Sequence, residues 1–238
     1  MNRLGIIVAV AAEARSFIKG PLRSGEPILF SEGAMLLISG MGPKRATKAC
    51  RALLDEGAAA LLSWGSAGGL APDLSPGSLI LPKTVVAPDQ SVYQVDLKWH
   101  QVLCRLLNEQ IPVCVGPLVE SSFVVRSPGD KTALFHQTGA IGVDMESAAV
   151  ASVAHERDAP FIAVRAVADP VGTAIPLSTM AAVDAFGRMD YFRLMQELAK
   201  RPAEIFGLVR MGRDYRAALR TLERVARLTG ENLSPFAK

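Results

Sequence analysis

Four acidic side chains occupy positions from which carboxyl groups can perform acid–base chemistry. Each lies just beyond an apolar segment or at the start of an Ala-rich one: Glu13, Asp144, Glu146 and Asp169. Neighbouring acids and burial push pKa values apart, so that one carboxyl group can donate a proton while another stays ionised. Each acid also has a structural interpretation, because Asp forms turns at strand ends and acids stabilise the first turn of a helix. If parallel strands bring the acids to one rim of a sheet, they form a pocket suited to proton transfer.

A glycine-rich segment, Gly65-Ser66-Ala67-Gly68-Gly69, directly follows an apolar run that ends at Trp64. Glycines at the carboxyl end of a strand let backbone N–H groups approach a ligand, and open parallel sheets bind ligands at that edge. The alternative interpretation is a tight turn without a ligand. The segment does not fit GxGxxG and no Gly-Lys-Ser/Thr follows it, which excludes a dinucleotide fingerprint and a P-loop.

Other catalytic and metal-binding chemistries find no support in the residue types. The three histidines lie outside any nucleophile elbow, so no Ser-His-Asp triad is indicated: His100, His136 and His155. The three cysteines show no CxxC spacing: Cys50, Cys104 and Cys114. An odd number without that spacing argues against a disulfide framework and a zinc site, and it indicates reduced thiols of a cytoplasmic protein. We therefore expect no metal and no cofactor.

Short β-branched runs alternate with helical periods, which is the pattern of an α/β domain. The predicted strands are Gly5–Val10, Met35–Ser39, Ala59–Trp64, Ser78–Val86, Val113–Leu118 and Phe161–Val167. One helix is predicted over Lys44–Glu56, with Pro43 at its first turn and Gly57 beyond its end. A second, Ala-rich helix is predicted over Glu146–Arg157. The predicted fold is a single α/β domain with a largely parallel mixed central sheet flanked by helices, plus a C-terminal amphipathic helix.

Composition sets the class and the domain number. Half of the 238 residues are hydrophobic and 21% are charged, which excludes disordered, collagen-like and coiled-coil classes. No apolar run of about 18 residues occurs, so no membrane-spanning helix is predicted. Leu4–Ala12 superficially looks like a short signal peptide, but Gly5–Val10 also reads as a buried strand and Glu13 follows it, so we favour the strand. We expect one domain over residues 1–200 and a basic helical extension over 201–238 packed on it.

The surplus positive charge lies in that extension, which holds 8 Lys or Arg against 4 Asp or Glu. Arginines recur at spacings of 3, 4, 4 and 3 along one side of the predicted helix: Arg213, Arg216, Arg220, Arg224 and Arg227. Apolar residues recur on the opposite side: Leu208, Met211, Tyr215, Leu219, Leu222 and Val225. The simplest interpretation is a helix docked on the domain with a solvated basic face.

The glycine segment and the acidic segments, in this order, resemble the nucleoside phosphorylase and nucleosidase superfamily. Within it, the chain looks most similar to methylthioadenosine/adenosylhomocysteine nucleosidases. Gly65–Pro72 is nearly the nucleosidase form of its segment, and Asp144-Met145-Glu146 matches a Glu-Met-Glu motif with Asp replacing the first Glu. Arg165–Asp169 matches the strand that delivers a purine-facing Asp. The correspondence covers about Gly5 to Asp169.

The resemblance implies a role for each matched residue. Asp169 would be the general acid at N7 of the purine, and Glu13 would position and deprotonate the attacking water. Glu146 would bind the ribose hydroxyls, with Met145 packing against the sugar and the base. Such a site neutralises the departing base and stabilises an oxocarbenium-like sugar.

Four further residues complete the implied site. Ser66 and its neighbours, Gly68 among them, would hold the water or a phosphate. Phe123 would stack on the base, and Val124 would belong to the segment that binds the purine edge through backbone groups. The implied partners are a small-molecule nucleoside and a second copy in a homodimer, with no nucleic acid.

Hydrolysis and phosphorolysis remain alternatives. Family phosphorylases hold phosphate with an arginine just before the glycine segment, where this chain has Ser63-Trp64. Together with Glu13, this favours water as the nucleophile. Arg15, Lys44 or Arg45 could still reach a phosphate, which would then be a co-substrate. A non-catalytic nucleoside-binding protein of the same fold is the alternative from another class, and the retained acids argue against it.

The C-terminal region resembles the hopanoid-associated branch of the superfamily in Asp169–Pro176, Arg201-Pro202 and the arginine-rich helix. That resemblance implies removal of adenine from adenosylhopane, in which a triterpenoid is joined to the 5′ carbon. A membrane-dissolved substrate must be met at the bilayer surface, and basic residues are attracted to anionic lipid. The arginine stripe is therefore also a candidate for peripheral contact with the inner membrane leaflet.

Overall fold

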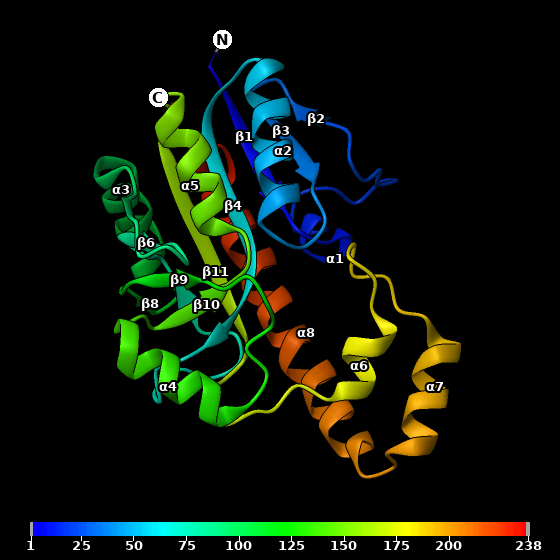
Figure 1. Cartoon of the computed structure of the whole chain (residues 1–238). Helices are drawn as coiled ribbons and strands as arrows, with labels where there is room; N and C mark the ends of the chain where they lie inside the picture. Colours follow the sequence, from blue (N-terminus) through cyan, green and yellow to red (C-terminus); the bar gives the residue numbers. More distant parts are fainter. Residues whose placement is uncertain (1, 237–238) are drawn as a thin grey trace.

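The sheet is built around strand β4 (Ala58–Gly69), in the computed structural model that describes residues 2–236 (Figure 1). β1 (Arg3–Val8) runs parallel to one edge of β4, and β11 (Phe161–Asp169) runs parallel to the other. These strands are nearly continuous apolar runs, as expected of strands that are covered on both faces. Their carboxyl ends therefore meet on one side of the domain.

Eight shorter strands extend this centre into an eleven-stranded mixed sheet. β2 and β3 continue it beyond β1, while β10, β9, β6 and β7 continue it beyond the carboxyl end of β4. β5 and then β8 continue it beyond β11. Their bounds are β2 (Ile28–Ser31), β3 (Ala34–Ile38), β5 (Leu79–Ile80), β6 (Thr84–Val86), β7 (Val92–Gln94), β8 (Val113–Cys114), β9 (Leu118–Glu120) and β10 (Gly142–Asp144). The predicted fold class is confirmed.

Helices cover both faces of the sheet (Figure 1). α2 and α5 pack side by side on one face, and the buried alanines of α5 allow a close approach. α8 packs against β11 and β4 on the other face, with α3 beside it. The helices are α1 (Ala11–Ala14), α2 (Pro43–Asp55), α3 (Leu97–Asn108), α4 (Pro128–Thr138), α5 (Ser147–Glu156), α6 (Leu177–Ala182), α7 (Tyr191–Lys200) and α8 (Glu204–Thr229), followed by the 3-10 turn η1 (Gly230–Leu233).

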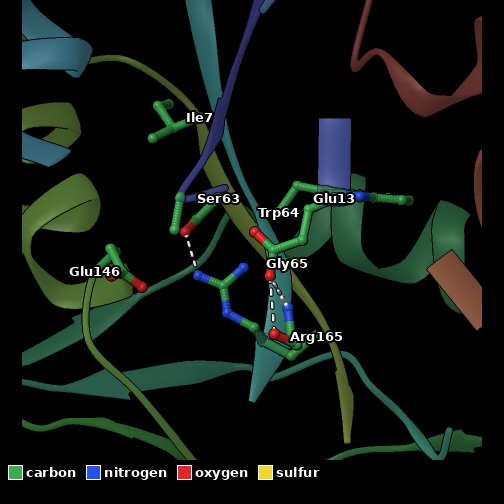
Figure 2. Close-up of a pocket in the computed structure, with 9 residues that line it drawn as sticks. Ile7, Glu13, Ser63, Trp64, Gly65, Glu146 and Arg165 are labelled. Atoms are coloured by element: carbon green, nitrogen blue, oxygen red, sulfur yellow. Dashed lines mark hydrogen bonds between the residues drawn. The ribbon is translucent and has the colours of Figure 1, made fainter. Parts of the chain in front are cut away.

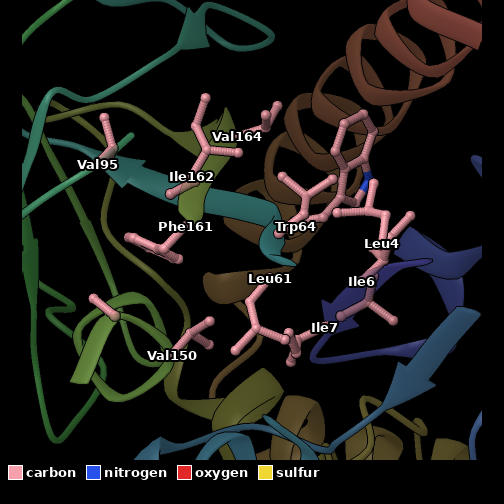
Figure 3. Close-up of a cluster of buried hydrophobic side chains, with 14 of the residues drawn as sticks. Leu4, Ile6, Ile7, Leu61, Trp64, Val95, Val150, Phe161, Ile162 and Val164 are labelled. Carbon is pink, nitrogen blue, oxygen red and sulfur yellow. The ribbon is translucent and has the colours of Figure 1, made fainter. Parts of the chain in front are cut away.

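The largest buried apolar cluster lies between these layers (Figure 3). Ile6, Leu61 and Ile162 come from three neighbouring strands and are fully buried. Trp64 is 1% exposed and packs against Phe17 with the two rings tilted, at a ring-centroid distance of 4.7 Å. This packing fixes the central strands, and with them the ends from which the candidate site is built.

Two predicted strands are wrong because each is really a pair of short strands. Ser78–Val86 is interrupted at Leu81–Lys83, where Pro82 cannot donate a ladder hydrogen bond, so β5 and β6 pair with different neighbours. Val113–Leu118 is interrupted by Gly116-Pro117 in the same way. The glycine segment is not a turn either, since Gly65–Gly69 continues β4.

The predicted helices are present with small shifts. α2 begins at Pro43 and ends at Asp55, before Gly57 at φ +93°. α5 begins one residue later than predicted, because Glu146 is its N-cap. On α8, Leu222 and Val225 are buried as expected, and the other four predicted apolar residues are half-buried.

Residues 177–212 form a helical arm, which comprises α6, α7 and the first turns of α8. Figure 1 shows the arm to one side of the sheet, while the rest of α8 lies along it. α6 packs against both α7 and α8. Among residues 2–236, no helix is both long enough and apolar enough to cross a membrane.

Candidate active site

Glu13 and Ser66 are brought together at the carboxyl ends of β1 and β4. Glu13 lies in α1, directly after β1, and is 3% exposed. Its Oε1 accepts hydrogen bonds from the backbone N–H and from the hydroxyl of Ser66, each at 2.8 Å. A Cβ at Gly65 would lie 2.9 Å from both carboxylate oxygens, so a larger residue there would displace the carboxylate from this position. The glycine-rich segment thus binds the carboxylate of Glu13 through Ser66 and leaves room for it at Gly65.

Burial raises the pKa of Glu13 above its ordinary value. The hydrogen bonds from Ser66 and the charge of Arg165 oppose the shift without cancelling it. A carboxyl group with a raised pKa can accept a proton at neutral pH more readily than an exposed one.

Glu146 is held at the N-terminus of α5 and is 9% exposed. Its Oε1 accepts a 2.7 Å hydrogen bond from the backbone N–H of Gly42, whose φ of +100° favours glycine. Within residues 2–236, its Oε2 accepts no hydrogen bond. Burial and the nearby Asp144 raise the pKa of Glu146 to about 8. One oxygen is thus anchored while the other faces the site.

Arg165 is a residue that the sequence analysis left without a role. It is 2% exposed in the middle of β11, and its Nε and Nη2 lie 2.7 and 2.6 Å from Oδ2 of Asp144. Nη2 also donates to the hydroxyls of Ser63 and Ser147. The signal was in the sequence, because an arginine inside a buried apolar strand must be paired.

The carboxylate of Asp144 has a structural role, because its oxygens are occupied by contacts within the protein. Besides binding Arg165, it accepts hydrogen bonds from the hydroxyl and, at 3.2 Å, the backbone N–H of Ser147. It therefore caps the start of α5 and fixes the guanidinium group. The two acids that flank Met145 have different environments, since only Glu146 faces the site.

A small cavity joins these groups (Figure 2). Its volume is about 10 Å³, which is close to the space that one water needs. A water in this cavity would have enough hydrogen-bond partners, because two carboxylates, a guanidinium and hydroxyl groups line it. The cavity is lined by Ile7, Ala9, Glu13, Ser63, Trp64, Gly65, Ser66, Glu146 and Arg165.

Asp169 lies at the carboxyl end of β11, in register with Gly68 of β4. A Cβ at Gly68 would lie 3.2 Å from Oδ2 of Asp169, so the strand passes directly beside the carboxyl group. Burial raises the pKa of Asp169, and the charge of Lys131 opposes the shift. Asp169 does not line the small cavity, so the structure provides two separate acidic positions beside β4.

Lys131 is the partner of Asp169 and was also missed. Its side chain is fully buried, and Nζ lies 2.6 Å from Oδ2 of Asp169. The same ammonium group donates to the carbonyls of Asp169, Pro170 and Thr173. Lys131 comes from α4 and nothing in its local sequence marks it, because the contact exists only in the assembled fold.

The predicted base-binding residues lie apart from the small cavity. Phe123 follows β9, is 73% exposed and lines a hollow of about 230 Å³ together with Glu120 and Ser121. Val124 and Met145 are half-buried and line neither cavity. The structure therefore brings Glu13, Ser66 and Glu146 together, places Gly68 beside Asp169, and leaves Phe123 at a neighbouring hollow.

The fold and these contacts define a class of protein: an α/β domain with a carboxylate-lined pocket at the carboxyl edge of its central strands. Residues 7–190 match the profile of the phosphorylase superfamily, and the chain belongs to that superfamily. The resemblance to nucleoside phosphorylases and nucleosidases is thereby confirmed.

Curated relatives are similar over a large part of the chain. A 5′-methylthioadenosine/S-adenosylhomocysteine nucleosidase of Oceanobacillus iheyensis is 28% identical over 165 residues, which cover 60% of this chain and 71% of the relative. The corresponding nucleosidase of Bacillus thuringiensis is 27% identical over 176 residues, covering 66% and 73%.

Solved structures share the fold over almost the full length. Futalosine hydrolase of Helicobacter pylori superposes with a TM-score of 0.72 at 18% identity, covering 98% of each chain. A Neisseria meningitidis 5′-methylthioadenosine/S-adenosylhomocysteine nucleosidase in complex with methylthio-immucillin-A also gives a TM-score of 0.72 at 18% identity, covering 98% of this chain and all of that one.

Proposed function

We propose that this chain hydrolyses the N-glycosidic bond of an adenosyl nucleoside and releases adenine. The observation that carries the proposal is the water-sized cavity on which Glu13, Glu146 and Arg165 converge. The names of the relatives, which are nucleosidases and a futalosine hydrolase, support the same chemistry.

Glu13 is the general base in this proposal. A water in the cavity donates to its carboxylate, which Ser66 holds in place with two hydrogen bonds. As the water attacks C1′ of the ribose, its proton passes to Glu13. The raised pKa of Glu13 favours that transfer.

Asp169 is the general acid. Because burial raises its pKa, it carries a proton more readily than an exposed aspartate and can donate it to N7 of the purine. The base then leaves as neutral adenine. Lys131 holds the carboxyl group in position, while Phe123 and Val124 contact the purine.

Glu146 stabilises the ribose. Its Oε2 accepts hydrogen bonds from the ribose hydroxyls, which favour the ionised form of a carboxyl whose pKa is about 8 without ligand. That negative charge then stabilises the cationic, oxocarbenium-like sugar of the transition state. Met145 packs beside the sugar from the same turn.

Water fits the cavity better than phosphate does. An anion beside Glu13 and Glu146 would be repelled, and the lining cation, Arg165, is already bound to Asp144. Of the candidate phosphate ligands, Arg15 donates to the carbonyls of the exposed 19–20 loop and Arg45 to that of Met41. Phosphorolysis is therefore the less favoured alternative.

We further propose that the 5′ substituent is hydrophobic, with adenosylhopane as an example. Support comes from the segment around Ala185 and Phe186, which covers the loop whose Gly42 donates a hydrogen bond to Glu146. The backbone N–H of Met41 donates to the carbonyl of Ala185, and Phe186 lies against Gly40. A substituent leaving the ribose on this side would meet the apolar base of the helical arm.

The test is release of free adenine from methylthioadenosine, adenosylhomocysteine and adenosylhopane, each assayed with and without phosphate. We expect phosphate-independent release, with kcat/KM highest for the hydrophobic substituent. Release that requires phosphate would overturn the hydrolytic assignment. Release from none of the three would overturn the assignment as a nucleosidase of adenosyl substrates.

A further inference from the structure

The outward face of α8 changes character along its length. Its first turns present Ile205, Phe206 and Val209, which are 49%, 81% and 69% exposed. The same face continues as exposed arginines: Arg213, Arg216, Arg220, Arg224 and Arg227. From 205 through 209 to 227 the spacing is 4, 4, 3, 4, 4 and 3, so apolar and basic residues form one continuous stripe about 33 Å long.

The orientation of this stripe is fixed by the opposite side of the helix. Ala218, Leu222 and Val225 are fully buried, and α8 packs through this side against β11 and β4. The arginine part of the stripe therefore lies on the outer surface of the domain. This side of the helix does not contribute to the hydrophobic core of the domain.

The apolar end of the stripe continues onto the rest of the helical arm. Tyr191, Phe192 and Met195 of α7 are 74%, 75% and 65% exposed, and Leu177 and Met180 of α6 are also exposed. A soluble protein rarely exposes so many large apolar side chains on three neighbouring helices unless they contact something.

The acids of this region are largely occupied by local contacts. Asp184 accepts from two backbone N–H groups, Asp190 caps α7, and Glu197 pairs with Lys200 and Arg201. Glu204 accepts from the backbone N–H of Ser178. On the arginine part of the outward face the acid Glu223 is paired with Lys19. The surface thus combines an apolar end with a predominantly positive stripe.

We propose that the helical arm and the arginine stripe of α8 bind the surface of an anionic lipid bilayer. The apolar side chains enter the interface, while the arginines meet lipid phosphates. This is the composition of helices that lie in the plane of a membrane, with aromatic and aliphatic residues beside a basic face.

A second copy of the chain is a less suitable partner for the whole surface. In a symmetric dimer whose two-fold axis passes through the stripe, the arginines of one copy would lie close to the arginines of the other. Like charges oppose such an association. A bilayer offers hydrocarbon for the apolar end and negative charge for the remainder.

The test is co-sedimentation with vesicles of phosphatidylcholine alone and of phosphatidylcholine with phosphatidylglycerol, at low and high salt. Arg216→Gln/Arg220→Gln/Arg227→Gln removes three stripe arginines, none of which has an ion-pair partner among residues 2–236. Phe206→Ser/Val209→Ser removes the two most exposed apolar side chains of the first turns of α8. Lys48→Gln/Lys98→Gln/Arg105→Gln and Val92→Ser/Val102→Ser are matched controls at exposed positions elsewhere.

We expect binding to the anionic vesicles alone, weakened at least about tenfold by high salt and by either stripe variant. The matched controls should bind as the wild type does, and all variants should keep its melting temperature. Absent or salt-independent binding would overturn the proposal, as would equal losses in the controls. If Phe206→Ser/Val209→Ser instead dissociated a dimer in sedimentation velocity and left vesicle binding unchanged, the arm would be an interface between copies.

Discussion

The Nζ of Lys131 lies 2.6 Å from Oδ2 of Asp169, and the lysine is fully buried. The contact joins α4 to the end of β11 and gives the proposed general acid a fixed neighbour. Burial raises the pKa of Asp169 while Lys131 lowers it, so the two effects together set the pH range over which the acid holds its proton.

Lys131→Met should therefore shift the pH profile and not only the stability. Without the ammonium group the pKa of Asp169 rises, and the alkaline limb of kcat/KM should move to higher pH. Breaking the pair should also cost about 3 kcal/mol of unfolding free energy. If the variant lost stability but the alkaline limb of kcat/KM stayed at the same pH, the role of Lys131 would be structural only. Lys131→Arg, which keeps the charge, should return the limb toward that of the wild type.

Asp169→Asn should lower turnover at least about 100-fold while the fold is retained, because the amide keeps the shape but cannot supply the proton. The measurement is adenine release together with a circular dichroism melt. Near-normal release by a folded variant would remove Asp169 from the acid role.

The position of Asp169 was predictable because it ends a strand that is apolar along most of its length. The places of Glu13 and Asp169 beside β4 also followed from parallel topology. Glu146 reaches the same edge differently, because it follows β10, which pairs with β4 in the antiparallel sense. Arg165 left a signal, since it interrupts that apolar strand, but its partners come from three different elements. Lys131 left no signal in the sequence, because its contact with Asp169 exists only in the folded chain. The apolar pattern alone predicted continuous strands where Pro82 and Gly116-Pro117 interrupt them.

Gly65→Ala should damage hydrolysis from a position that carries no functional group. The new Cβ would lie 2.9 Å from both oxygens of Glu13, so the carboxylate must move away from Ser66. We expect a fall in kcat approaching that of Glu13→Gln, with ligand binding largely retained because the role concerned is water activation. Gly20→Ala is the control, since its Cβ would meet nothing within 4 Å. Full activity of Gly65→Ala would show that this contact is not needed for water activation.

Glu146 should make the free energy of unfolding depend on pH. Its pKa rises from 4.5 to about 8 on folding, so the folded state holds the extra proton between these values. Its stabilising contribution is complete below pH 4.5 and is lost as the pH rises through 8. Urea titrations from pH 5 to 9 should show a fall that Glu146→Gln reduces. Glu120, with a pKa raised to about 7, contributes in the same direction and remains in that variant. An identical slope in wild type and Glu146→Gln would contradict the assignment.

Glu146→Gln should also weaken ribose binding and lower turnover together, since the contact to the hydroxyls strengthens as the sugar becomes cationic. Stopped-flow binding of an adenosyl nucleoside and steady-state kinetics measure the two effects separately. A variant with weaker binding but unchanged kcat would limit Glu146 to holding the substrate.

The nature of the sugar product tests the central claim most directly. The wild-type protein is incubated with an adenosyl nucleoside that it cleaves, in excess inorganic phosphate, and the products are resolved by ³¹P NMR and mass spectrometry. The cavity shared by Glu13, Glu146 and Arg165 predicts free adenine and a free 5-substituted ribose, formed at a rate that phosphate does not change. A 5-substituted ribose 1-phosphate, accumulating with the adenine, would contradict water as the nucleophile.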